Sequence, residues 1–173
     1  MTIELIPVAA AIGFLTKYVD LIEDEGLKSF KHANLFFGAG YGLLIGMVIA
    51  NYTIVAPLFL AVIAATILTG KIDSKGHYSG VAAILLVLLI QGLKAVDWQL
   101  FGIFLIAGVA DELVNTKPMF KRIGRLLKRI FKLRLILEIT TFIVSLTTGV
   151  WILWITLLNF DVAYILTNKV LGK

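Results

Sequence analysis

The sequence predicts an all-α integral membrane protein that crosses the bilayer several times. Sixty per cent of its 173 residues are hydrophobic and only 16 per cent are charged, whereas a soluble domain is roughly half apolar and a quarter charged. Several apolar runs approach the roughly 20 residues that a helix needs to cross a bilayer. Residues 82–90, AAILLVLLI, do not alternate in polarity as the strands of a membrane barrel do. We therefore predict about six hydrophobic helices, five or six of them crossing, in one transmembrane domain over residues 1–173.

The predicted segments follow from the uncharged runs between polar stretches. Asn51 and Tyr52 form a tight turn, and Pro57 lies within the first turn of the third helix, where its missing N–H costs least. The fourth and fifth segments are short for a full crossing, which predicts tilting or a hairpin. The last residues, 160–173, are too few to span and are expected along the surface. The six segments are 3–19, 33–50, 53–69, 79–93, 99–110 and 135–158.

The first segment is expected to remain in the mature protein. Glu4 stands where a signal peptide would carry basic residues, and Lys17 and Asp20 interrupt the place of a cleavage site. The chain has no cysteine, which excludes disulfides, thiolate metal sites and cysteine nucleophiles.

A basic stretch, KPMFKRIGRLLKRIFKLR, separates the fifth and sixth segments at residues 117–134. Its apolar residues recur at steps of three and four, which predicts an amphipathic helix in the membrane plane with its cations toward the headgroups. Such a helix is a topology anchor or a clamp for anionic headgroups and substrate phosphate. In the second case Arg122 and Arg125 would contact the phosphate.

The cations lie almost entirely on one side of the predicted topology. The opposite loops hold only Lys94. The positive-inside rule makes the cation-rich side cytoplasmic and the N-terminus external. We expect the plasma membrane of a prokaryote as the location. The loops that follow the first, third and fifth segments hold twelve cations, namely Lys28, Lys31, Lys71, Lys75, Lys117, Lys121, Arg122, Arg125, Lys128, Arg129, Lys132 and Arg134.

Acidic residues end three of these segments on the same cytoplasmic side. The macrodipole disfavours negative charge at a helix C-terminus by some tenths of a kcal/mol, so a cation should offset them. Oxygen ligands favour Mg²⁺ or Mn²⁺, and one imidazole would permit Zn²⁺ or Fe²⁺. The alternative is solvated helix ends with weak ion pairs to neighbouring lysines. The predicted metal ligands are Asp20, Asp24, Asp73, Asp111 and Glu112.

Catalytic and phosphate-binding roles are predicted for the polar loop after the third segment. His77 would act as acid, base or ligand beside Asp73. Lys71 and Lys75 would contact phosphate.

Glycines at four-residue spacing mark one face of the second segment. Gly38, Gly42 and Gly46 predict close helix packing, either within the chain or in a homodimer. The alternative is a groove for a lipid tail, with Phe36, Phe37 and Tyr41 at its mouth.

The acidic stretch DLIEDEG, residues 20–26, resembles the aspartate-rich motifs of membrane-embedded prenyltransferases of the ubiquinone-biosynthesis type. That resemblance implies Mg²⁺ and a prenyl diphosphate held at the cytoplasmic ends of helices. The family uses two such motifs in eight or nine helices, whereas this chain is about half that size and its second stretch reads KIDSKGH. No family membership is assigned.

Three functions are compatible with these features. The leading hypothesis is a Mg²⁺-dependent intramembrane enzyme that transfers or hydrolyses a lipid-linked phosphate or diphosphate at the cytoplasmic face, with membrane lipid as partner and no nucleic acid. A cation or small-solute transporter is the second, although the second to fourth segments carry almost no polar group at mid-membrane apart from Gln91. A non-catalytic membrane subunit is the third.

Overall fold

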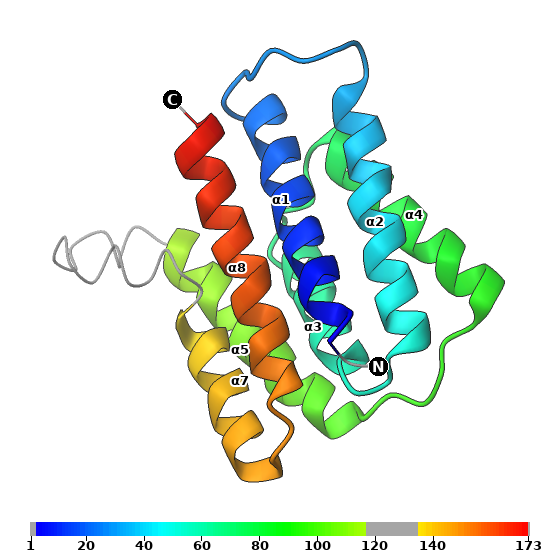
Figure 1. The fold of residues 1–173 in the computed structure, drawn as a ribbon, viewed down its shortest axis with the longest axis vertical. Helices are drawn as coiled ribbons and strands as arrows, with labels where there is room; N and C mark the ends of the chain where they lie inside the picture. The colour runs from blue at the N-terminus through cyan, green and yellow to red at the C-terminus, as the bar shows by residue number, and fades with distance from the viewer. Residues whose placement is uncertain (1–2, 117–134, 173) are drawn as a thin grey trace, which may run out of the picture.

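The computed structural model describes residues 3–116 and 135–172 (Figure 1). These ranges are all-helical and contain no strand, so the predicted fold class is confirmed at that level. Two helices, α1 and α2, are long and apolar enough to cross a bilayer. The predicted basic helix at 117–134 lies outside the described residues. The helices are α1 (Leu5–Glu23), α2 (Ala33–Asn51), α3 (Ala56–Leu68), α4 (Lys75–Gln91), α5 (Trp98–Thr116), α7 (Leu135–Thr148) and α8 (Ile152–Leu171).

The first and last helices lie side by side and run in the same direction (Figure 1). The backbone of Phe160 in α8 lies against Gly13 in α1, and Tyr164 donates a hydrogen bond to Asp20 one to two turns further on. The C-terminal end of α8 therefore lies at the same end of the bundle as the C-terminal end of α1.

The predicted glycine face packs within the chain, against α4. An added Cβ on Gly38 would overlap the backbone of Gly76, and one on Gly42 would overlap the backbone of Gly80. Absence of side chains thus lets two parallel helices approach closely. A second copy of the chain could not use this face for the predicted homodimer without displacing α4.

The sixth predicted segment, 135–158, is not one helix, and that prediction is wrong. The chain breaks at Gly149, whose φ of 76° is in the left-handed region that glycine adopts readily. Helices α7 and α8 then form an antiparallel pair (Figure 1). The backbone N–H of Trp154 donates to Ser145 Oγ across this turn at 3.2 Å. Residues 160–171 continue α8 against α1 instead of lying along the surface.

The boundaries of α4 and α5 differ from the predicted ones in a way that affects the site. Ser74 caps α4, with its Oγ accepting from the backbone N–H of His77 at 3.4 Å. His77 is therefore in the first turn of α4, while Asp73 precedes the cap and lies in the loop. Helix α5 continues to Thr116, which places Asp111 and Glu112 on a helix.

Candidate functional site

A cavity of about 370 Å³ opens at the end of the bundle where α1 and α8 end and α2 and α4 begin. We call this the charged end. Residues from α1, α2, α3, α4, α5 and α8 and from the loop between α3 and α4 line the cavity. Its polar lining consists of Thr16, Asp20, Asp24, Tyr41, Thr66, Lys71, Asp73, His77, Glu112 and Tyr164.

The other half of the cavity lining is apolar and, apart from Ile72 in the loop between α3 and α4, lies deeper between the helices. Helix α3 shows this change in polarity, since the lining residue near its C-terminal end is the polar Thr66 and the one near its start is the apolar, buried Leu58. Helix α4 changes in the same sense from His77 to Ile84. The cavity is therefore amphipathic along its length. Its apolar lining consists of Ile45, Leu58, Phe59, Val62, Ile63, Ile72, Val81, Ile84, Leu157 and Phe160.

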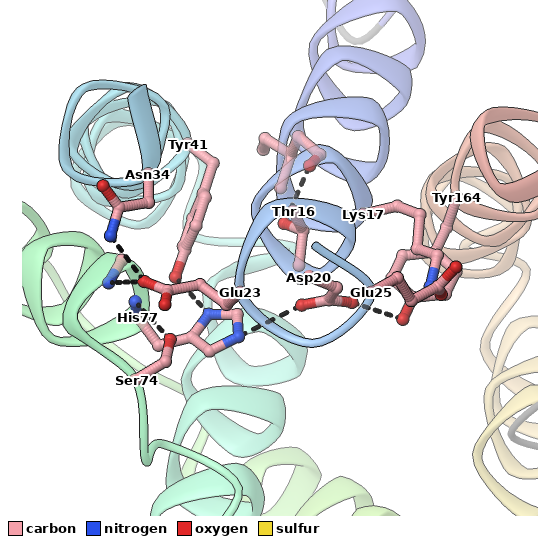
Figure 2. A network of polar contacts seen from close by, with 12 residues as sticks. Thr16, Lys17, Asp20, Glu23, Glu25, Asn34, Tyr41, Ser74, His77 and Tyr164 are labelled. Carbon is pink, nitrogen blue, oxygen red and sulfur yellow. Dashed lines mark hydrogen bonds and ion pairs between the residues drawn. The ribbon is translucent and has the colours of Figure 1, made fainter. Parts of the chain in front are cut away.

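His77 lies between two other residues of the lining, one on each side of its ring (Figure 2). Its Nε2 is 3.1 Å from Asp20 Oδ1, and its Nδ1 is 2.9 Å from the Tyr41 hydroxyl. Tyr164 donates to the other oxygen of Asp20. These four side chains come from α4, α1, α2 and α8, so the contacts connect four helices across the cavity mouth.

A second junction holds three of these helices, α1, α2 and α4, together just outside the cavity (Figure 2). Glu23 Oε1 accepts from Asn34 Nδ2 at 2.7 Å and from the backbone N–H of Gly76 at 2.9 Å. The carboxylate at the end of α1 thus fixes the first turns of α2 and α4. This junction holds α4, and with it His77, against α1.

The carboxylates of the mouth are close enough to act on one another electrostatically. Asp24 is exposed, but partial desolvation by its surroundings, together with the negative charges of Asp20 and Asp73, raises its pKa. His77 lies ahead of the apolar stretch of α4 that begins at Ser79. The hydrogen bond of His77 to Asp20 raises the pKa of the imidazole above its ordinary value, and the negative charges of Asp24 and Asp73 raise it further. Burial acts in the opposite direction.

Few cations balance this negative charge within the cavity lining. Lys71 is the lysine of the lining, and its Nζ is 3.8 Å from Glu112 Oε2. Lys75 is exposed at the start of α4 and is not part of the lining. Four carboxylates therefore face one lysine and His77 in the described part of the mouth. Arg122 and Arg125, the other predicted phosphate contacts, lie outside the described residues.

Asp111, predicted as a metal ligand, has a structural role in the fold that was not predicted. It is only 2 per cent exposed, and its two carboxylate oxygens accept from the backbone N–H groups of Ile136 and Leu137 at 3.0 and 2.7 Å. Those donors are in the first turn of α7, where N–H groups lack partners within the helix. Asp111 is not in the lining of the cavity, while its neighbour Glu112 is.

Of the predicted metal ligands, Asp20, Asp24, Asp73 and Glu112 all line the cavity. Across residues 3–116 and 135–172, no three His, Asp or Glu side chains are gathered closely enough to hold a metal ion as they stand. Asp24 and Asp73 are exposed at the mouth, whereas Asp20 is engaged by His77 and Tyr164.

Two tyrosine contacts in the site were not predicted, although Tyr41 was expected at the mouth of the alternative lipid-tail groove. Tyr164 belongs to the stretch expected along the surface, so its contact with Asp20 depends on the unpredicted break at Gly149. Tyr41 lies one residue before Gly42 on the glycine-rich helix, and only the close approach of α4 brings His77 to its hydroxyl. The length of the apolar pattern from Leu135 to Leu171, with a glycine inside it, was the available signal for two helices.

Comparison with protein-family models, with curated proteins and with solved structures finds no significant match to this chain.

Proposed function

We propose that the protein crosses the membrane repeatedly, with α1 and α2 joined in the bilayer by the shorter apolar helices. Large apolar side chains are exposed on the outside of the bundle, for example Leu89 at 83 per cent, Ile90 at 75 per cent and Ile106 at 74 per cent. An aqueous surface rarely carries so much exposed apolar area, whereas lipid tails would cover it at no cost.

The described cations support a cytoplasmic position for the charged end. Lys28, Lys31, Lys71 and Lys75 lie in or next to the loops at this end, and the parallel packing of α8 on α1 adds Lys169. Lys94 follows α4 at the opposite end. The positive-inside rule then makes the cavity mouth cytoplasmic and the N-terminus external.

We propose that the cavity is the active site of an enzyme acting on a lipid-linked phosphate or diphosphate. The observation that carries this proposal is the amphipathic lining, with carboxylates, lysine and histidine at the mouth and buried aliphatic and aromatic side chains below it. An apolar pocket with a few convergent polar groups is the usual form of a small-molecule site. An amphiphile would place its tail among the helices and its headgroup at the mouth.

The charge of the mouth makes a divalent cation part of this proposal. Among the described residues, the mouth has four carboxylates and one lysine, and a divalent ion would supply positive charge for a phosphate group there. Mg²⁺ usually binds through one or two carboxylates plus substrate phosphates and keeps several waters. Asp24 and Asp73 are the exposed carboxylates of the mouth and are assigned to the ion. Such a site needs no preformed group of three protein ligands.

The remaining polar residues of the mouth have distinct proposed roles. Lys71 contacts a phosphate oxygen, and Glu112 holds its ammonium group toward the mouth. Asp20 orients His77, whose other ring nitrogen faces the Tyr41 hydroxyl. When His77 is protonated, its Nε2–H donates to Asp20 and its Nδ1–H donates to the Tyr41 oxygen, which leaves the Tyr41 hydroxyl proton to serve as the general acid toward a leaving group. A divalent ion held by Asp24 and Asp73 would supply neutralisation of phosphate charge and orientation of the transferred group.

Turnover of a model substrate tests this function. Purified protein in nanodiscs, given farnesyl diphosphate and Mg²⁺, is expected to release phosphate or pyrophosphate, and EDTA should abolish that release. Asp73→Asn should reduce the rate at least about tenfold, the size expected for loss of an ion-binding carboxylate. Asp97→Asn, at the opposite end of the bundle, is the control. Release that is equal in both variants or unaffected by EDTA would contradict the proposal.

A cation transporter is the second candidate, and the excess of carboxylates at the mouth favours it. The fully buried polar side chains of Thr141, Ser145 and Thr156 in α7 and α8 add polar groups within the bundle that the earlier segments lack. Cation flux into proteoliposomes without turnover of any lipid phosphate would favour this function over the enzyme.

A further inference from the structure

The shape of the cavity restricts the tail of its ligand. The apolar half is bounded at depth by Ile45, Leu58, Phe59, Ile84 and Leu157, each less than a tenth exposed. These five are the best covered side chains of the apolar lining, and we take them as its deep end. A tail that enters from the mouth therefore meets a floor.

The helices give the distance from mouth to floor. In α3 the lining runs from Thr66 at the polar end to Leu58, eight residues, and in α4 it runs from His77 to Ile84, seven residues. At 1.5 Å of rise per residue these stretches are about 10–12 Å long. An extended chain advances about 1.2 Å per bond, as the polypeptide backbone does, so this depth accommodates about eight to ten bonds.

The cavity volume limits the number of chains. At about 370 Å³ the cavity is near the lower end of the roughly 300–1,000 Å³ typical of small-molecule pockets. Aromatic and branched side chains from four helices surround the deep half, so a second chain beside the first would require the helices to separate. Close-packed interiors resist such expansion.

We infer that the ligand is a phosphate carried on a single chain of about nine to eleven carbons, and that Phe59 and Ile84 set its upper length. This inference rests on the proposed function and deepens it. Two-chain phospholipids, including phosphatidic acid with the same phosphate chemistry, are excluded from the site. A longer single chain must fold back or leave its headgroup out of reach of Asp24 and Asp73.

Binding in a bilayer separates the fit of the chain from its hydrophobicity. Octyl, dodecyl and hexadecyl phosphate are compared at equal mole fraction in phosphatidylcholine nanodiscs with Mg²⁺, by displacement of radiolabelled dodecyl phosphate from immobilised protein. A tail that moves from lipid to the cavity gains little from apolar transfer, so fit decides affinity. Dodecyl phosphate is expected to bind about tenfold more tightly than hexadecyl phosphate, the order of an overpacking penalty. Dimyristoyl phosphatidic acid should not compete.

Variants of the floor provide the decisive comparison. Phe59→Ala should remove the preference for dodecyl over hexadecyl phosphate, whereas Phe104→Ala, a buried phenylalanine outside the lining, should retain it. If Phe59→Ala does not fold, Ile84→Ala replaces it. Equal affinity for dodecyl and hexadecyl phosphate, or a preference unchanged in the floor variant, would overturn the inference while leaving the proposed function intact. Absence of Mg²⁺-dependent binding at every chain length would instead count against the proposed function.

Discussion

The backbone carbonyl of Gly80 in α4 occupies the place where a Cβ on Gly42 of α2 would stand. This approach brings the start of α4 against α1 and α2, and it is what places His77 between Asp20 and Tyr41. The close packing of α4 on α2 at Gly42, which has no side chain, therefore also sets the position of His77 in the site.

Gly42→Ala should lower the free energy of unfolding by about 1–3 kcal/mol, the usual cost of an added methyl group in a packed interior. The neighbouring Gly40→Ala is a matched control on the same helix, because its Cβ would be 3.8 Å from Leu15 Cδ1, an ordinary contact. Alanine also has the higher helix propensity, so Gly40→Ala should be neutral or stabilising. Equal thermal stability of the two variants would contradict the packing described.

Asp111→Ala should reduce stability by about 1–3 kcal/mol, since it leaves buried N–H groups at the start of α7 without their acceptor. Asp97→Ala removes a comparable cap from α5, where an exposed Asp97 accepts from Gln99 and Leu100 at 3.0 Å. Loss of this exposed cap should reduce stability less than loss of Asp111, because water can accept hydrogen bonds from the freed N–H groups of Gln99 and Leu100.

The same pair of variants tests the division of roles among the acidic residues. Thermal stabilisation by Mg²⁺ should persist in Asp111→Ala, since its carboxylate is committed to α7. If Asp111→Ala remains folded but is no longer stabilised by Mg²⁺, Asp111 contributes to the ion site and the division of roles is wrong.

Stability should depend on pH through His77. The pKa of His77 is raised in the folded protein. The stability that its protonated form contributes is therefore fully present below its pKa in the unfolded chain, about 6.5, and is lost as the pH rises through its pKa in the folded protein. The melting temperature should therefore fall across this window in the wild type. His77→Gln should flatten the profile, whereas His32→Asn, a change at the exposed start of α2, should not. Parallel profiles for wild type and His77→Gln would refute this assignment.

Sequence reasoning located most helices because uncharged apolar runs record burial in lipid or in a core. It also placed Asp20, Asp24, Asp73, His77 and Glu112 at one end of the molecule, because alternating helices return to the same side. The structure has all five in one cavity.

The unpredicted part of the site depends on a single backbone conformation. Hydropathy does not distinguish one long helix from two helices joined at Gly149, so the path of α8 along α1 and the contact of Tyr164 with Asp20 were missed. The role of Asp111 was missed for a related reason. Its partners are backbone N–H groups, which leave no trace in side-chain patterns.

Equilibrium binding of dodecyl phosphate in nanodiscs, with Mg²⁺ and with EDTA, tests the central claim most directly. Tight binding should require Mg²⁺, and the double variant Asp24→Asn/Asp73→Asn should weaken the Mg²⁺-dependent binding by at least about tenfold, or about 1.4 kcal/mol. Binding that is as strong in EDTA as in Mg²⁺, or that improves when the two carboxylates are neutralised, would show that the mouth does not hold a phosphate through a divalent ion.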